Sequence, residues 1–162
     1  MSNHNLFLHG ADGATRLASN EEILKAARQL LAHRVRRGAL LQSPQKVGEY
    51  LTMRLGNLDY ECFGLILVDC RHRVIDCVEL FRGTIDGASV YPREIVKLAL
   101  DKGAAGAVAY HNHPSGVKDR SHADELITKR LAEALATVEV KLLDHLILAG
   151  LDVLSFAQSG LL

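Results

Sequence analysis

Apolar residues recur at helical spacing near the start of the chain. Ser19 followed by Glu22 is a capping-box pattern, in which each side chain bonds the other residue's backbone, and Gly38 is a residue type that commonly ends a helix. We therefore predict an amphipathic helix between Ser19 and Gly38. The Gly-, Asn- and His-rich residues before Ala18 predict a disordered or loosely docked tail. The apolar stripe of the helix is expected to contain Ile23, Leu24, Leu30 and Leu31.

The pattern then changes from helix to strand. The pair Ser43-Pro44 offers a cap and a proline at the first helical position, so a second helix should run from there to about residue 56. Residues 61–68 (ECFGLILV) and residues 73–81 are short, largely apolar and separated by a turn, which predicts a β-hairpin. Residues 83–89, which glycines interrupt, predict either a brief strand or a loop.

The second half of the chain continues this alternation. A helix should begin at Tyr91-Pro92 and end at Gly103, and the small apolar residues 104–110 (AAGAVAY) predict a strand that is covered on both faces. A loop over residues 111–120 should lead to a long helix over residues 121–137. The inward side of that helix is expected to carry Leu126, Ile127, Leu131 and Leu135.

The last residues complete the plan. Residues 138–149 predict one or two strands, and residues 153–156 predict a last short strand. Strands that alternate with helices in this way form a sheet with helices packed on it. The sequence therefore predicts a mixed-sheet α/β (α+β) fold.

Composition narrows the class of protein. The chain has 162 residues, a length that suits one domain with its own hydrophobic core, and its formal net charge is zero. No global field therefore attracts nucleic acid or an anionic membrane, so we do not expect direct DNA binding. A basic cluster lies near the end of the first helix and comprises Arg28, Arg34, Arg36 and Arg37. We interpret it as a solvated face that the helix dipole stabilises. The alternative is a surface that binds DNA or a partner protein.

The cysteines and the chain's apolar runs suggest a compartment. Three cysteines without a C-x-x-C pair argue against a disulfide framework or a cysteine zinc knuckle. The first residues lack a signal-peptide pattern, and no apolar run approaches the ~20 residues of a membrane span. We therefore expect a soluble, cytoplasmic protein.

The clearest chemical content lies in residues 109–124 (AYHNHPSGVKDRSHAD). They follow the predicted buried strand, at the kind of position where α/β proteins commonly bind ligands. His111 and His113 are two apart, so in an extended chain both imidazoles point to the same side, and Pro114 then takes the chain out of the sheet. Imidazole nitrogen suits zinc, and Asp124 could supply a third ligand from the next helix, which leaves one position open for water.

Each part of this pattern also has an ordinary interpretation. Two histidines at this spacing occur in many polar loops. Ser121 with Asp124 is by itself a helix start, in which the serine caps the helix and the carboxylate interacts favourably with its dipole. The combination of a strand, H-x-H-P, a short loop and such a helix start favours a metal site. The interpretations are compatible, because a helix start can hold a ligand rigidly.

The same segment resembles a known motif. Residues 109–124 are similar to the JAMM motif, H-x-H followed by seven residues and S-x-x-D, whose four positions are matched by His111, His113, Ser121 and Asp124. The stretches ELFRGTIDGASVYPREIVKLAL, AYHNHPSG and LLDHLILAG resemble the RadC-like branch of the JAMM/MPN superfamily. The resemblance covers about residues 51–162.

The resemblance carries implications for the fold and the domains. It implies a cytidine-deaminase-like mixed sheet flanked by helices, in a JAMM/MPN domain over residues 43–162, with a tail and an amphipathic helix over residues 1–42. Arg120 stands where RadC-like loops usually carry proline. The Gly-x-Gly hairpin of the helix-hairpin-helix module found in full-length RadC proteins is not recognisable in residues 1–50, so the chain resembles the short, stand-alone form.

The resemblance also implies a reaction. One zinc ion per chain would be bound by His111, His113 and Asp124, and the chain would hydrolyse a peptide or isopeptide bond in a peptide or protein substrate. Zinc lowers the pKa of its bound water to about 7. Ser121 would donate a hydrogen bond to the tetrahedral oxyanion.

The resemblance further implies that a glutamate from earlier in the chain takes the water's proton. Three glutamates precede the histidines closely: Glu61, Glu79 and Glu94. Glu61 stands before a Cys-Phe-Gly-apolar strand, a placement that resembles the JAMM glutamate, so we predict Glu61 as the general base and Glu79 as the second candidate. A solvent-facing residue at a strand start is the alternative interpretation of Glu61.

Two alternatives stay open at this point. The position of His145 within the predicted strand LLDHLILAG favours a structural histidine whose ring nitrogens are hydrogen-bonded. The alternative is a role behind a metal ligand. The competing function is a non-catalytic binding module of the same fold, associated with DNA repair or a mobile element. Such modules typically lose the histidines or the aspartate, whereas this chain keeps them all.

Overall fold

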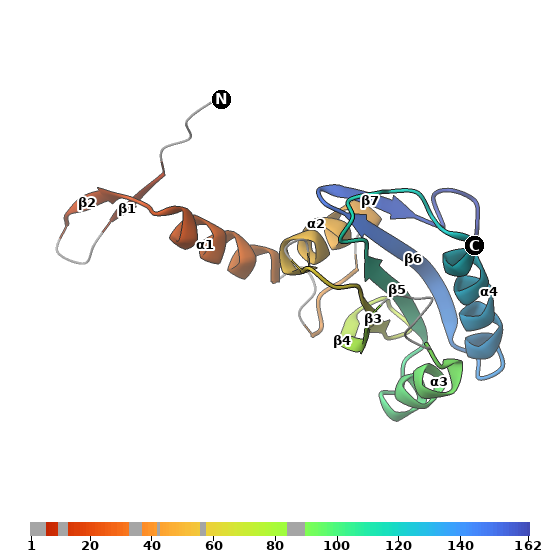
Figure 1. The fold of residues 1–162 in the computed structure, drawn as a ribbon. Helices are drawn as coiled ribbons and strands as arrows, with labels where there is room; N and C mark the ends of the chain where they lie inside the picture. Colours follow the sequence, from red (N-terminus) through yellow and green to blue (C-terminus); the bar gives the residue numbers. More distant parts are fainter. Residues whose placement is uncertain (1–5, 10–12, 33–36, 42, 56–57, 84–89) are drawn as a thin grey trace.

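A mixed sheet of five strands, in the order β4-β3-β5-β6-β7, forms the centre of the fold. The computed structural model describes residues 6–9, 13–32, 37–41, 43–55, 58–83 and 90–162. Figure 1 shows the course of the chain. In chain order the elements are β1 (Phe7–His9), β2 (Thr15–Leu17), α1 (Asn20–Ala32), α2 (Pro44–Leu55), β3 (Cys62–Val68), β4 (Val74–Arg82), α3 (Pro92–Asp101), β5 (Gly106–Asn112), α4 (His122–Ala136), β6 (Lys141–Ala149) and β7 (Asp152–Ser155).

The inner strands β3 and β5 are the most deeply covered. β3 pairs antiparallel with both β4 and β5, β5 pairs parallel with β6, and β6 pairs antiparallel with β7. Every residue of β3 and β5 is buried, because nearly all their side chains are small or apolar and can pack on both faces of the sheet. The predicted mixed sheet with helices is confirmed.

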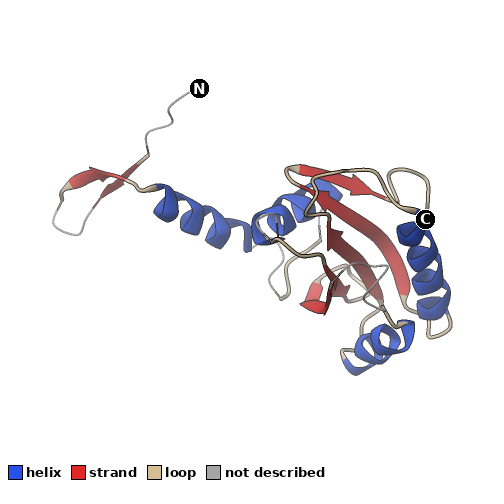
Figure 2. Ribbon diagram, viewed as in Figure 1, coloured by secondary structure: helices blue, strands red, loops and turns tan. Residues whose placement is uncertain are grey.

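Helices cover both faces of the sheet (Figure 2). On one face, strand residues such as Ile66 pack with Leu51 of α2. On the other face, strand residues such as Leu65 pack with α3 and with Leu131 of α4. Successive side chains of a strand point to opposite faces, so each inner strand contributes to two separate cores.

The predicted helices and strands of this domain are found with bounds that differ by a few residues. The loop predicted to begin at His111 starts later, because His111 and Asn112 are still paired within β5. On α4 the inward residues are confirmed except for Leu126, which is 49% exposed. The inward row advances by four residues at a time through Ile127 and Leu131. Leu126 precedes that row by one residue, which turns its side chain away by about 100°.

The disordered form of the predicted N-terminal tail is wrong for the residues that the structure describes. β1 and β2 form an antiparallel hairpin that projects from the sheet domain together with α1 (Figure 1). The capping box is present, since Ser19 N–H donates to Glu22 Oε2 at 3.0 Å and Glu22 N–H donates to Ser19 Oγ at 3.2 Å. The apolar stripe of this helix is not a buried one, because Leu24 is 49% and Leu30 72% exposed.

Several predictions fall outside the described residues. They are the end of the first helix before Gly38, the side chain of Leu31, Arg34 and Arg36 of the basic cluster, and residues 84–89 of the glycine-interrupted segment. Within the described ranges, no helix is long and apolar enough to cross a membrane.

A close contact in the sheet leads to a stability prediction. A Cβ atom at Gly64 would lie 2.3 Å from the Tyr110 ring and 2.5 Å from the Val78 carbonyl oxygen. Tyr110 is fully buried and its hydroxyl donates to that same carbonyl at 3.2 Å, so neither neighbour can retreat freely. Gly64→Ala should therefore lower the free energy of unfolding by about 1–3 kcal/mol. Urea denaturation measures this change, and an unchanged midpoint and slope would contradict the packing described.

Candidate metal centre

Three chain segments meet at one edge of the sheet. β5 ends there, its antiparallel neighbour β3 begins there, and α4 starts after the connecting loop. His111, near the end of β5, lies opposite Phe63 of β3, whose side chain belongs to the core beneath α3 and α4. His111 therefore points to the side of the sheet from which Asp124, in the first turn of α4, approaches.

The backbone keeps both histidines on this side. His113 N–H donates to Leu148 O at 2.7 Å, so the chain stays alongside β6 through His113, and two-residue alternation gives both imidazoles the same direction. After Pro114 the chain turns, and Gly116 N–H donates to His113 O at 3.0 Å. Gly116 has a φ of 72°, a value that favours glycine.

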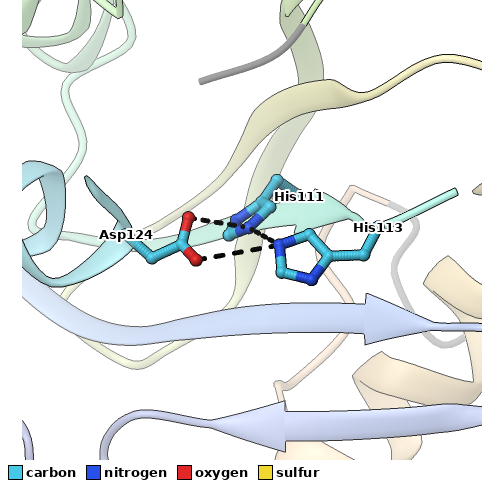
Figure 3. A group of neighbouring side chains, drawn as sticks. All are labelled: His111, His113 and Asp124. Carbon is cyan, nitrogen blue, oxygen red and sulfur yellow. Dashed lines mark hydrogen bonds and ion pairs between the residues drawn. The ribbon is translucent and has the colours of Figure 1, made fainter. Parts of the chain in front are cut away.

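The side chains of His111, His113 and Asp124 face one another (Figure 3). His111 Nε2 lies 3.0 Å from His113 Nε2 and 3.1 Å from Asp124 Oδ1, and His113 Nε2 lies 3.7 Å from Asp124 Oδ2. Ligands that bind one tetrahedral ion at ~2.0–2.1 Å lie roughly 3.3 Å apart. The three residues thus fit a single metal ion. The side chains of His111 and Asp124 are buried, whereas that of His113 is 13% exposed, so solvent reaches the cluster beside His113.

Two of the three groups in the cluster, His113 and Asp124, present acceptor atoms to it. His113 Nδ1 lies 2.8 Å from Val117 O, and a carbonyl can only accept, so the ring proton is on Nδ1 and Nε2 of the neutral imidazole carries a bare lone pair. That lone pair, His111 Nε2 and the Asp124 carboxylate converge within 4.8 Å of one another. A cation is the natural partner for such a set of acceptors.

The helix start holds Asp124 in place. Ser121 donates to Asp124 Oδ2 through its N–H at 2.7 Å and through its hydroxyl at 2.8 Å, and Asp124 N–H donates back to Ser121 Oγ at 3.1 Å. Burial alone would raise the pKa of Asp124, but His111 and the hydrogen bonds from Ser121 outweigh it and hold that pKa well below its usual range. The carboxylate is therefore charged at neutral pH, and Oδ1 is left facing His111.

Burial also determines the charge of His111. Burial lowers the pKa of His111, while Asp124 and, more weakly, Glu61 raise it, and burial prevails. A neutral imidazole is the form that binds a metal.

Glu61 lies beside this cluster, and the other two glutamates lie elsewhere. Continuing the β3–β5 register by two residues from the Phe63–His111 pair places Glu61 opposite His113. Glu79 pairs with Gly64, whose close neighbour Tyr110 belongs to the core beneath α2, so Glu79 lies on the other face of the sheet. Its carboxylate accepts from Arg82 Nε at 2.8 Å. The carboxylate of Glu94, in the first turn of α3, accepts from neighbouring Arg93 at 3.2 Å.

Asn112 holds the backbone on both sides of Glu61. Its Nδ2 donates to Tyr60 O at 3.0 Å, and its Oδ1 accepts from Cys62 N–H at 2.7 Å. The Asn112 side chain thus pairs with the backbone as a neighbouring strand would, just before β3 begins. In the sequence Asn112 stands only as the residue between His111 and His113, and no pattern there predicts this pairing.

Two further residues lie behind His111. His145 is completely buried and both its ring nitrogens have a hydrogen-bond partner, as expected of a structural histidine, and its Nε2 lies 2.8 Å from His111 Nδ1, where the alternative interpretation would place it. Its other ring nitrogen lies 2.6 Å from the hydroxyl of Thr128, a residue the sequence analysis did not single out. A signal existed, because Thr128 follows Asp124 by one helical turn and so shares its face of α4.

Comparison with known proteins shows clear relatives. The family model described as RadC-like JAB domain matches residues 41–161. A UPF0758 protein of Shewanella amazonensis is 49% identical over 148 residues, which cover 91% of this chain and 66% of that protein. UPF0758 proteins of Shewanella oneidensis and Shewanella baltica (strain OS155) are 46% identical over the same shares. The chain therefore spans just under two thirds of the length of these curated relatives.

Proposed function

The chain belongs to the family of RadC-like JAB domain proteins, and on that premise we propose that it is a zinc-dependent hydrolase that cleaves peptide or isopeptide bonds. The observation that carries the proposal is the convergence of His111, His113 and Asp124 at separations of 3.0–3.7 Å, which suit the ligands of one ion. Three protein ligands leave a fourth position for water or substrate, which is the arrangement of catalytic rather than structural zinc sites.

Zinc is the metal that this ligand set favours. Two imidazoles and one carboxylate form a mixed nitrogen and oxygen set, which suits a borderline ion better than the all-oxygen sets of magnesium or calcium. When bound, zinc would lower the pKa of a water molecule to about 7 and polarise the scissile carbonyl. The remaining chemistry falls to the protein's own side chains.

Glu61 is the proposed general base. It lies next to the cluster in the β3–β5 register, and its charge acts on His111. In this role its carboxylate removes a proton from the attacking water and passes it to the leaving amine. Asn112 supports the role by holding the backbone at Tyr60 and Cys62, which fixes where the Glu61 side chain starts.

Ser121 is the proposed donor to the oxyanion. Its hydroxyl donates to Asp124 Oδ2 at 2.8 Å and lies at the exposed start of α4. To serve the oxyanion, the hydroxyl proton must turn from Asp124 to the substrate, while the Ser121 N–H continues to hold the carboxylate.

A substrate screen with matched metal states tests this proposal. Purified protein would be stripped with a chelator, reloaded with zinc, and incubated with peptide and isopeptide-linked libraries, whose products are read by mass spectrometry. Zinc-dependent cleavage that vanishes in Asp124→Asn is the expected result. If the zinc-loaded protein cleaves no library member but binds a folded partner protein, the hydrolase proposal would be wrong and the protein would be a non-catalytic binding module.

A further inference from the structure

A continuous row of buried polar groups runs from α4 along the face of the sheet that α4 covers to the candidate metal centre. Thr128 Oγ1 lies 2.5 Å from Asp124 O and 2.6 Å from His145 Nδ1, and His145 Nε2 lies 2.8 Å from His111 Nδ1. All four residues are at most 2% exposed. The row therefore starts at the backbone of one candidate ligand and ends on the ring of another, without contact with bulk water.

The positions of the protons follow from these short contacts. Two oxygens 2.5 Å apart repel unless a proton lies between them, and a carbonyl has none, so the Thr128 hydroxyl donates to Asp124 O. The hydroxyl has no second proton, so at 2.6 Å it must accept one from His145 Nδ1. A neutral imidazole has only one N–H, and His145 Nε2 must therefore accept from His111 Nδ1 at 2.8 Å.

We propose that Thr128 and His145 are positioning residues that keep the ring proton of His111 on Nδ1, so that Nε2 presents its lone pair to the metal. This inference rests on the proposed zinc site. The surroundings agree with it, because Phe63 and Phe156 pack against the His145 ring at centroid distances of 5.7 and 5.1 Å and hold its plane.

The Nδ1 atoms of the two candidate histidine ligands have different hydrogen-bond partners, and these partners fix the ring proton in different ways. His113 Nδ1 faces a carbonyl, which can only accept and so fixes the proton without help. His111 faces an imidazole, which can either donate or accept. The direction of that contact is decided by Thr128, whose single proton is already committed to Asp124 O. The hydroxyl of Thr128 is therefore needed, and not only its volume.

Replacing Thr128 tests this need with a matched pair of variants. Thr128→Val removes the hydroxyl and keeps the shape, whereas Thr128→Ser keeps the hydroxyl and loses a methyl group. The dissociation constant for zinc alone would be measured by competition with a chromophoric chelator, with thermal unfolding as a check of folding. Thr128→Val should bind zinc about 10- to 100-fold more weakly than wild type, the range seen when groups behind metal ligands are altered. Thr128→Ser should bind it nearly as tightly as wild type.

A spectroscopic measurement on the unaltered protein makes the test independent of any variant. In metal-free wild type, nitrogen-15 NMR should find the ring protons of His111 and His145 on Nδ1. A proton on Nε2 of His111 would overturn the inference, and so would a folded Thr128→Val that binds zinc as tightly as wild type. A merely structural role would lower the unfolding temperature of Thr128→Val and leave its zinc affinity unchanged. If wild type itself takes up no zinc, the proposed function fails, and the positioning role fails with it.

Discussion

Glu61→Gln should reduce hydrolysis by about 10²–10⁴-fold, the usual contribution of general acid–base catalysis, while leaving zinc content unchanged. Glutamine keeps the size and the hydrogen-bonding reach of the side chain but cannot take a proton at neutral pH. Glu61 lies beside the cluster of His111, His113 and Asp124 and is not one of its three residues, so the loss should appear in kcat. Steady-state kinetics on a substrate from the library screen, with zinc analysis of the same samples, measures both quantities.

Glu79→Gln is the matched control. Glu79 belongs to the neighbouring strand β4. Its side chain lies on the face of the sheet toward α2, where its carboxylate pairs with Arg82. The control should therefore hydrolyse the substrate at close to the wild-type rate. Wild-type turnover in Glu61→Gln together with an inactive Glu79→Gln would assign the base to Glu79.

His113→Ala should lose most of its zinc and, with it, all measurable hydrolysis. Removal of one of three protein ligands leaves two, which is fewer than catalytic zinc sites use. Because His113 is partly exposed, its loss should disturb the core less than the loss of fully buried His111. Inductively coupled plasma mass spectrometry should find about one zinc per chain in wild type and a small fraction of that in His113→Ala.

His122→Ala serves as the control for histidine loss in general. His122 is exposed, begins α4 and lies two residues before Asp124, yet it is not part of the cluster. Its zinc content should equal that of wild type. Full zinc occupancy in both His113→Ala and His111→Ala would show that the metal binds elsewhere.

The arrangement of the candidate site follows closely from local sequence rules. Extended backbone through His113 gives both histidines one direction, and α4 starts at S-x-x-D with Ser121 as the expected cap, to which Asp124 adds the reciprocal bond of a capping box. These features depend on residues close together in the chain, and for that reason a pattern can predict them. The two interpretations of Asp124, cap and ligand, turn out to use different atoms, since Ser121 donates to Oδ2 and His111 faces Oδ1.

Contacts between distant segments escaped the sequence analysis. Thr128 and His145 meet across the packing of α4 on β6, and Asn112 reaches residues about fifty positions earlier. No periodic pattern reports such pairs. The N-terminal hairpin was missed for another reason: its strands have three residues each, too few for an alternation to be recognised.

The exposure of Leu126 and Leu30 shows that an apolar residue at helical spacing is not always part of the hydrophobic core. Leu126 was predicted to point inward and Leu30 to belong to an apolar stripe, and they are 49% and 72% exposed. Spacing identifies a face of a helix, but the width of that face depends on what packs against it. The buried face of α4 consists of Asp124, Ile127, Thr128, Leu131 and Leu135, and Leu126 falls outside that face.

The most direct measurement of the central claim is a crystal structure of the zinc-loaded protein with diffraction data collected on both sides of the zinc absorption edge. The account predicts one anomalous peak per chain, at ~2.0–2.1 Å from His111 Nε2, His113 Nε2 and an oxygen of Asp124. An anomalous map without a peak among these three side chains, or with its only peak at another site, would contradict it.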